Sequence, residues 1–284
     1  MTCSVKDEST SPHCPICPHR CAPAEGERGI CGARVRRGDS ILSESYGYIT
    51  SLALDPIEKK PLARYYPGSM ILSAGSYGCN LFCSFCQNAS ISRGTLHSTH
   101  AEYISPEDLV ARAIETKKAG GIGIAFTYNE PLVGYEYVLD TSILAKKSGL
   151  KTVLVTNGYI NEEPLRVLLP YIDAMNIDLK APDDTRYRSL GGHLAPVLSA
   201  IENASRCCHV EVTSLIVPGL NDTQDAMRQT ATHIARIDRN IPLHVSRFFP
   251  RYHMSDTAAT SVETIRMLQT VAMEQLSYVY TGNL

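Results

Sequence analysis

The chain has 284 residues, of which 44 % are hydrophobic and 20 % are charged, which is enough for one large hydrophobic core. Lys and Arg total 27 against 29 Asp and Glu, so the formal net charge is −2 and no basic excess points to nucleic acid. The first eight residues are polar, and no apolar run approaches the ~18 residues needed to span a bilayer. These features argue against a nucleic-acid-binding or membrane protein and predict a cytoplasmic one.

The composition changes near residue 68, so we expect a small Cys-rich N-terminal extension over residues 1–67 and a larger α/β domain over residues 68–284. Short runs of apolar or β-branched residues predict strands at 70–75, 123–127, 151–156, 174–179, 209–217 and 243–248. Helical patterns lie between them, at 135–147, 162–169, 195–206, 223–238 and 262–274, and one further helix begins after Ser105 with Pro106 in its first turn.

This regular alternation of strand and helix implies a parallel sheet with right-handed crossovers. Six βα units are fewer than the eight of a closed TIM barrel, so we predict an open, partial (β/α)6 barrel. In such folds the carboxyl ends of the strands carry the chemistry.

The loop after the first expected barrel strand contains Cys79, Cys83 and Cys86, with the spacing C-x3-C-x2-C and no fourth cysteine at a comparable distance. A [4Fe–4S] cluster normally takes four thiolates, so three would leave one iron open to an exogenous ligand. An open iron can bind the amino and carboxylate groups of S-adenosylmethionine (SAM). The alternatives are three reduced core cysteines or a zinc knuckle that lacks one ligand.

The N-terminal extension holds four further cysteines with the spacing C-x2-C-x3-C-x9-C, namely Cys14, Cys17, Cys21 and Cys31. A second metal, either zinc or another cluster, is one interpretation, although the spacing fits neither a standard zinc ribbon nor the common ferredoxin pattern. We expect Cys207 and Cys208 to be ordinary thiols and Cys3 to lie in a disordered tail.

The cysteine triad followed by a partial barrel resembles the radical SAM superfamily. The resemblance is closer to the pyruvate formate-lyase activating enzyme branch and, within it, to the AmmeMemoRadiSam-system radical enzymes. It rests on segments spread over nearly the whole chain: 14–21, 55–61, 78–80, 85–88, 127–131, 156–159, 176–180, 218–222 and 244–250. It implies a [4Fe–4S] cluster on the triad and SAM as the second cofactor.

The resemblance also implies contacts with SAM after the second and third strands. Relatives grip the methionine ammonium with a Gly-Gly-Glu, and this chain keeps Glu130 but has Tyr128 and Asn129 in place of the glycines. Thr156 and Asn157 would hydrogen-bond the methionine or the ribose. The alternative for residues 129–131 is an ordinary turn and helix start.

Asp178 and Lys180 lie two apart on the fourth strand and therefore point to the same side of the sheet. The resemblance implies that Lys180 neutralises the methionine carboxylate and that Asp178 accepts from the ribose or the ammonium. Their alternative is an internal salt bridge. Phe85 would pack on the adenine, or else belong to the core.

Charged residues on or after the sixth strand form a last group, one of which we expect to contact the ligand: His244, Arg247, Arg251 and His253.

Together these features predict an enzyme that cleaves SAM reductively and abstracts hydrogen from an unidentified protein or small-molecule substrate. The electron would come from a donor such as flavodoxin or ferredoxin. Two alternatives remain open from the sequence: an activase that installs a glycyl radical on a partner protein, and a metal-binding scaffold without catalysis.

Overall fold

The computed structural model describes residues 12–284, so Cys3 lies outside the described part of the chain. One eight-stranded sheet forms the centre, in the order β12-β11-β10-β9-β8-β7-β5-β4. Its strands are β4 (Ser51–Pro56), β5 (Met70–Gly75), β7 (Gly121–Phe126), β8 (Lys151–Thr156), β9 (Ala174–Asp178), β10 (His209–Ile216), β11 (Leu243–Arg247) and β12 (Val279–Gly282). Neighbours from β5 to β12 pair in parallel, whereas β4 pairs antiparallel with β5.

All six expected strands are present, and the sheet has two more, β4 and β12. Strand β4 comes from the segment before residue 68, so both parts of the chain contribute to one sheet. Strand β12 has only four residues, and three of them are half-buried, which explains why no apolar run indicated it. The partial barrel therefore has an edge strand beyond each end of the expected set.

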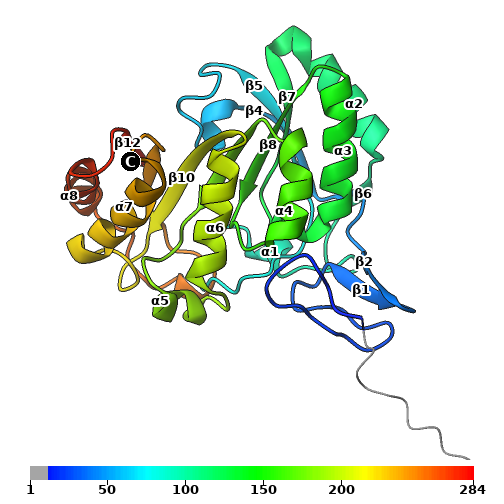
Figure 1. The fold of residues 1–284 in the computed structure, drawn as a ribbon, viewed down its shortest axis with the longest axis horizontal. Coiled ribbons are helices and arrows are strands. Elements are labelled where there is room, and N and C mark those ends of the chain that lie inside the picture. Colours follow the sequence, from blue (N-terminus) through cyan, green and yellow to red (C-terminus); the bar gives the residue numbers. More distant parts are fainter. Residues whose placement is uncertain (1–11) are drawn as a thin grey trace, which may run out of the picture.

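Helices cover the outer face of the sheet, and α2, α3, α4 and α6 stand side by side in Figure 1. The helices are α1 (Ala89–Ser92), α2 (Pro106–Glu115), α3 (Tyr135–Lys147), α4 (Glu162–Leu168), α5 (Asp184–Ser189), α6 (Leu194–Ser205), α7 (Gln224–Asp238) and α8 (Val262–Met273). The expected cap of α2 is confirmed, because the Ser105 side chain accepts a hydrogen bond from the Asp108 N–H. None of the helices within residues 12–284 is long and apolar enough to cross a bilayer.

Two small antiparallel pairs lie outside the main sheet. Strands β1 (Arg34–Arg37) and β2 (Ser40–Ser43) form a hairpin, and β3 (Tyr48–Ile49) pairs with β6 (Glu102–Tyr103). The hairpin lies at the same end of the molecule as α1 and α5 (Figure 1). The Cys79 N–H donates to the Cys31 carbonyl at 3.2 Å, so the N-terminal segment contacts the cysteine loop directly.

The segment from Ile57 to Tyr65 packs against the inner side of the sheet. Ile57 and Leu62 are fully buried there and share a cluster with Ile71, Ala125 and Val153. A barrel that does not close exposes the inner face of its strands, and this segment covers that face. The open fold therefore gains an internal core from residues that precede its first parallel strand.

A buried carboxylate holds this segment in place. Glu211 is completely buried and accepts hydrogen bonds from the N–H groups of Ala63 and Arg64, at 3.0 and 2.8 Å. The ring nitrogens of His209 and His244 lie 2.9 and 2.6 Å from its two oxygens. Burial alone would raise the pKa of Glu211, but these hydrogen bonds lower it from 4.5 to about 2.

Because the folded-state pKa is below the unfolded value, Glu211 stabilises the fold above pH 4.5, and this contribution is lost as the pH falls toward 2. We expect Glu211→Gln to lower the free energy of unfolding by about 3 kcal/mol at pH 7. The difference from the wild type should shrink below pH 4. Urea unfolding of both proteins across this range measures it, and a deficit independent of pH would contradict the assigned role of the charge.

Candidate active site

The expected cofactor-binding residues line one cavity of about 350 Å³ at the carboxyl ends of the strands. They lie at or after the carboxyl ends of strands β5, β7, β8 and β9, which meet at one edge of the sheet. The cavity wall includes all eleven of them: Cys79, Cys83, Phe85, Cys86, Tyr128, Asn129, Glu130, Thr156, Asn157, Asp178 and Lys180. The fold thus brings together segments that lie up to a hundred residues apart.

The cysteine loop is held in shape by its neighbours. Gly78 has φ of +88°, and a Cβ there would lie 2.7 Å from the Ala33 Cβ and 2.8 Å from the Cys31 carbonyl oxygen, so only glycine fits. The Arg93 guanidinium donates to the carbonyl oxygens of Cys79, at 3.0 Å, and Leu81. The loop is therefore fixed by main-chain contacts on both sides.

The amide side chain of Asn80 connects this loop to the end of β8. It donates to the Tyr159 carbonyl at 2.8 Å and accepts from the Asn157 amide at 2.8 Å. The Asn157 Nδ2 also lies 3.7 Å from the Cys79 sulfur, and the Leu81 N–H lies 3.5 Å from the same atom. These donors stabilise negative charge on the sulfur.

Burial raises the pKa of Cys79 to about 12, with a further rise caused by the Glu130 charge, and burial also raises the pKa of Cys83. Such thiols ionise only when a metal takes the place of the proton. Within residues 12–284, no group of three or more His, Cys, Asp or Glu is arranged to hold a single metal ion. Three thiolates leave one iron of a [4Fe–4S] cluster without a protein ligand, so the donor set of the triad fits a cluster with one open iron.

Glu130 links the end of β7 to the end of β8 through hydrogen bonds of its side chain. Its carboxylate accepts hydrogen bonds from the Thr156 hydroxyl at 2.7 Å, the Asn157 N–H at 2.7 Å and the Leu132 N–H at 3.1 Å. Burial raises the pKa of Glu130 to about 7, although these donors act in the opposite direction. A cationic group brought into the cavity would favour the ionised form. The residue also caps the short helix η4 (Pro131–Gly134), as the turn interpretation expected.

Asp178 and Lys180 form an ion pair of 2.8 Å on the cavity wall. Burial acts to lower the pKa of Lys180, but the Asp178 charge raises it above its usual value, so the ammonium is charged. The Tyr187 hydroxyl accepts from the Lys180 N–H at 3.0 Å and fixes the backbone. The two residues thus form the internal salt bridge that was the alternative interpretation, and both also line the cavity. Phe85 likewise lines the cavity and packs in a core cluster with Leu190, Val217 and Phe248.

Tyr128 adopts a left-handed backbone conformation with φ of +73°, which is uncommon for a residue that is not glycine. Its hydroxyl donates to Asp55 at 2.7 Å, and the Lys60 ammonium lies 4.8 Å from the centre of its ring. Asn129 accepts from the Ser76 N–H at 2.9 Å and donates to the Tyr77 carbonyl at 3.0 Å. The two residues that replace glycines therefore join the β7 loop to its surroundings.

Asp55 and Lys60 are functional candidates that the sequence analysis did not single out. Lys60 is 2 % exposed, lines the cavity and pairs with Asp55 at 2.9 Å. Both belong to segment 55–61, one of the segments on which the resemblance rests. The resemblance therefore included these two residues but assigned them no role. Burial acts to raise the pKa of Asp55, but its hydrogen bonds from Lys60 and Tyr128 lower it.

The four charged residues on and after the sixth strand, one of which we expected to contact the ligand, are not among the residues that line the cavity. His244 pairs with Glu211 deeper in the barrel, and the Arg247 guanidinium donates to the Thr260 carbonyl at 2.6 Å. Arg251 and His253 are exposed. The cavity is lined instead by Ser246, which lies two residues after His244 on the same strand face but nearer the carboxyl end.

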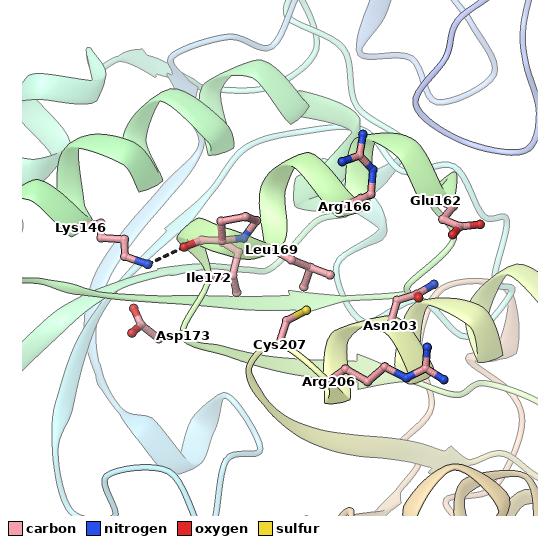
Figure 2. A pocket seen from close by; sticks show the side chains of 10 residues that line it. Lys146, Glu162, Arg166, Leu169, Ile172, Asp173, Asn203, Arg206 and Cys207 are labelled. Atoms are coloured by element: carbon pink, nitrogen blue, oxygen red, sulfur yellow. Dashed lines mark hydrogen bonds between the residues drawn. The ribbon is translucent and has the colours of Figure 1, made fainter.

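A second cavity, of about 410 Å³, lies at the amino ends of β8, β9 and β10 (Figure 2). Its cationic side chains already have partners, because Lys146 donates to the Pro170 carbonyl, Arg166 pairs with Glu163 and Arg206 pairs with Glu202. Parallel α/β folds place their chemistry at the opposite end of the strands. We therefore assign the active site to the cavity around the cysteine triad.

A partial α/β barrel with three thiols at the carboxyl end of its first parallel strand defines a class of cluster-binding enzymes. A family model described as the radical SAM superfamily matches residues 74–234. The chain therefore belongs to the radical SAM superfamily.

Its relatives place it more closely. It is 42 % identical over 274 residues to the uncharacterized protein MJ0808 of Methanocaldococcus jannaschii, covering 95 % of this chain and 80 % of that protein. It is 29 % identical to the pyruvate formate-lyase-activating enzyme of Clostridium pasteurianum, over 58 % of this chain and 68 % of that enzyme.

Solved structures agree on the fold. A domain of pyruvate-formate lyase-activating enzyme from Bacteroides vulgatus gives a TM-score of 0.50 at 16 % identity, over 57 % of this chain and 99 % of that one. A radical SAM methyltransferase from Sphaerobacter thermophilus gives a TM-score of 0.55 at 18 % identity, over 76 % and 67 % of the two chains. The protein is thus an enzyme of the radical SAM type that is similar to pyruvate formate-lyase activating enzymes, and the partial-barrel prediction is confirmed. The family implies a [4Fe–4S] cluster and SAM.

The two adjacent lysines beside Asp55 allow a matched test of the buried pair. Lys60→Met leaves the Asp55 carboxylate buried without its main partner, and we expect a loss of about 3 kcal/mol in the free energy of unfolding. Lys59 also lies 3.2 Å from Asp55, but its side chain is 66 % exposed, so Lys59→Met should cost less than about 1 kcal/mol. Urea unfolding measures the free energy of unfolding of both variants. Equal decreases in Lys60→Met and Lys59→Met would contradict the role given to burial of the Asp55–Lys60 pair.

Proposed function

We propose that this enzyme cleaves SAM reductively and abstracts hydrogen from an unidentified substrate, as a radical SAM enzyme of the AmmeMemoRadiSam type. The observation that carries the proposal is the convergence of Cys79, Cys83 and Cys86 with eight SAM-contact candidates on one cavity. Cys79, Cys83 and Cys86 would hold the cluster, which when reduced would supply the electron for reductive cleavage of SAM. The type is supported by the N-terminal cysteine segment and by segment 55–61.

The residues of this chain would hold the methionine part of SAM by charge. The Lys180 ammonium suits the carboxylate, and the Glu130 carboxylate suits the ammonium. Glu130 accepts three hydrogen bonds from the protein, so one acceptor direction remains for a ligand. Asp178 would then accept from the ribose, and Phe85 would pack on the adenine.

The rest of the cavity wall is the proposed substrate side. Its lining includes polar side chains from both ends of the chain, among them Lys60, Asn88, Ser246 and Asn283. These side chains offer donors and acceptors to a protein segment or a polar small molecule. We propose a one-electron donor such as flavodoxin or ferredoxin as the second partner.

Removal of one cluster ligand tests the proposal. Cys83→Ala should abolish formation of 5′-deoxyadenosine from SAM in anaerobically reconstituted, dithionite-reduced protein, because the cluster loses a required thiolate. Cys207→Ala removes an exposed thiol outside the cavity and should retain the wild-type rate. Wild-type turnover in Cys83→Ala would refute the assignment of the triad.

A glycyl-radical activase is the second candidate, favoured by identities of 29 % and 26 % to the pyruvate formate-lyase-activating enzyme and to an isethionate sulfite-lyase activating enzyme of Oleidesulfovibrio alaskensis. It shares the cofactor chemistry and differs in the target. Electron paramagnetic resonance of a candidate partner protein after incubation separates the two, because only an activase leaves a stable glycyl radical there.

A further inference from the structure

The four N-terminal cysteines converge on one small enclosed cavity, together with Gly29, Arg34 and apolar side chains. The convergent set is Cys14, Cys17, Cys21 and Cys31, of which only Cys21 is half-buried and the others are buried. None of the four is in a disulfide. Four cysteines separated by up to seventeen positions in the sequence thus line the same cavity.

The backbone is shaped to bring these residues together. The Cys14 N–H donates to the Cys21 carbonyl at 2.9 Å and closes the loop between them, and Arg20 takes a left-handed conformation with φ of +46°. A Cβ at Gly29 would lie 3.3 Å from the Cys21 Cβ and 3.4 Å from its sulfur, so glycine leaves room for that side chain.

A buried cation with an unsatisfied donor lines the same cavity. Arg34 is 3 % exposed, and its terminal nitrogens are paired with Glu136 at 2.6 and 2.8 Å and with the carbonyl oxygens of Ile41 and Val133. Its Nε is buried and has no hydrogen-bond partner. Buried polar groups are almost always paired, so this N–H indicates an acceptor that the protein side chains do not provide. Sulfur ligands of a metal carry negative charge and would supply one.

A cluster of neutral thiols is the simpler alternative, because free cysteine behaves as a small apolar side chain. That interpretation explains the burial of the cysteines. It does not explain the placement of a guanidinium with an unpaired donor against them, which is costly in an apolar environment. A negatively charged centre explains both observations.

We propose that Cys14, Cys17, Cys21 and Cys31 bind a second, four-thiolate metal centre, occupied by a thiophilic metal as a zinc ion or an iron–sulfur cluster. Four protein thiolates leave no open position, so the centre is closed and does not bind SAM. In this structure the four sulfur atoms, like those of the triad, are not arranged for a single ion. The cavity that they line has a volume of only about 10 Å³, so either a zinc ion or a cluster would require the cysteine side chains to change rotamer.

The position of the centre gives it a supporting role for the active site. The Cys31 carbonyl accepts from the Cys79 N–H at 3.2 Å, and the His19 ring nitrogen lies 2.8 Å from the Asn80 carbonyl oxygen. The Asn161 N–H donates to the Ile16 carbonyl at 2.9 Å, which attaches the same loop to the start of α4. A metal that fixes residues 14–31 therefore also fixes the backbone on which the triad stands.

The test measures bound metal after the active-site triad has been removed. A Cys79→Ala, Cys83→Ala, Cys86→Ala variant is purified anaerobically and reconstituted either with Zn²⁺ or with Fe²⁺ and sulfide. We expect it to retain about one zinc, or about four irons with sulfide, per chain. Retention of zinc or of iron with sulfide identifies the metal, and retention of neither overturns the proposal.

Further variants assign the retained metal to these cysteines. Adding Cys17→Ala and Cys31→Ala to the triad variant should remove that metal, whereas adding Cys207→Ala and Cys208→Ala should leave it. Equal retention in both would place the metal elsewhere and refute the site. Circular dichroism confirms that each variant is folded.

The reciprocal variant covers the case in which the triad variant does not fold. With the triad intact, Cys17→Ala and Cys31→Ala should lower the metal content by one centre relative to the wild type, and an unchanged content refutes the site. This result is independent of the proposed function, because failure of that function appears as absent SAM cleavage with the second metal still bound.

Discussion

A short chain of buried hydrogen bonds, from Asn80 through Asn157 to Glu130, determines how the active site is built. It connects the cysteine loop after β5 to the ends of β7 and β8, so three separate loops take one fixed arrangement. Because the links are buried, their amide and carboxylate groups must be paired with each other, and each loop constrains the next. The donors that reach the Cys79 sulfur belong to the same network. The same hydrogen-bond network therefore determines the position of the Cys79 thiol and the shape of the cavity proposed for SAM.

A second constraint follows from the open barrel. Strands that do not close leave an inner face that must be covered, and residues 57–65 cover it. Two buried carboxylates hold this segment, Glu211 through its main-chain N–H groups and Asp55 through Lys60 and Tyr128. Asp55 lies beside the cavity, whereas Glu211 lies deeper in the barrel. The segment before the first parallel strand thus contributes both to stability and to the wall of the active site.

Much of the fold could be predicted because it depends on local signals. The strands and helices follow from short apolar runs, caps and turn residues, and the carboxyl-end rule correctly predicted that the triad, Glu130, Asn157 and Lys180 would converge. The interior packing of residues 57–65 depends on contacts more than a hundred residues apart and has no local signal. His244 and Ser246 share a strand face, and only their depth in the barrel decides which one reaches the cavity. The unpaired nitrogen of Arg34 is likewise visible only in three dimensions.

The central claim is that the triad holds a cluster with one iron open to SAM. The most direct measurement is the electron paramagnetic resonance spectrum of the dithionite-reduced, reconstituted protein before and after addition of SAM. A spectral change on addition of SAM is assigned to the triad, because a closed four-thiolate centre has no position open for SAM. The account predicts a cluster signal whose g-values shift when SAM is added, because the ligand binds an iron directly. A signal unaffected by saturating SAM, or no cluster signal in a protein that contains only zinc, would contradict it.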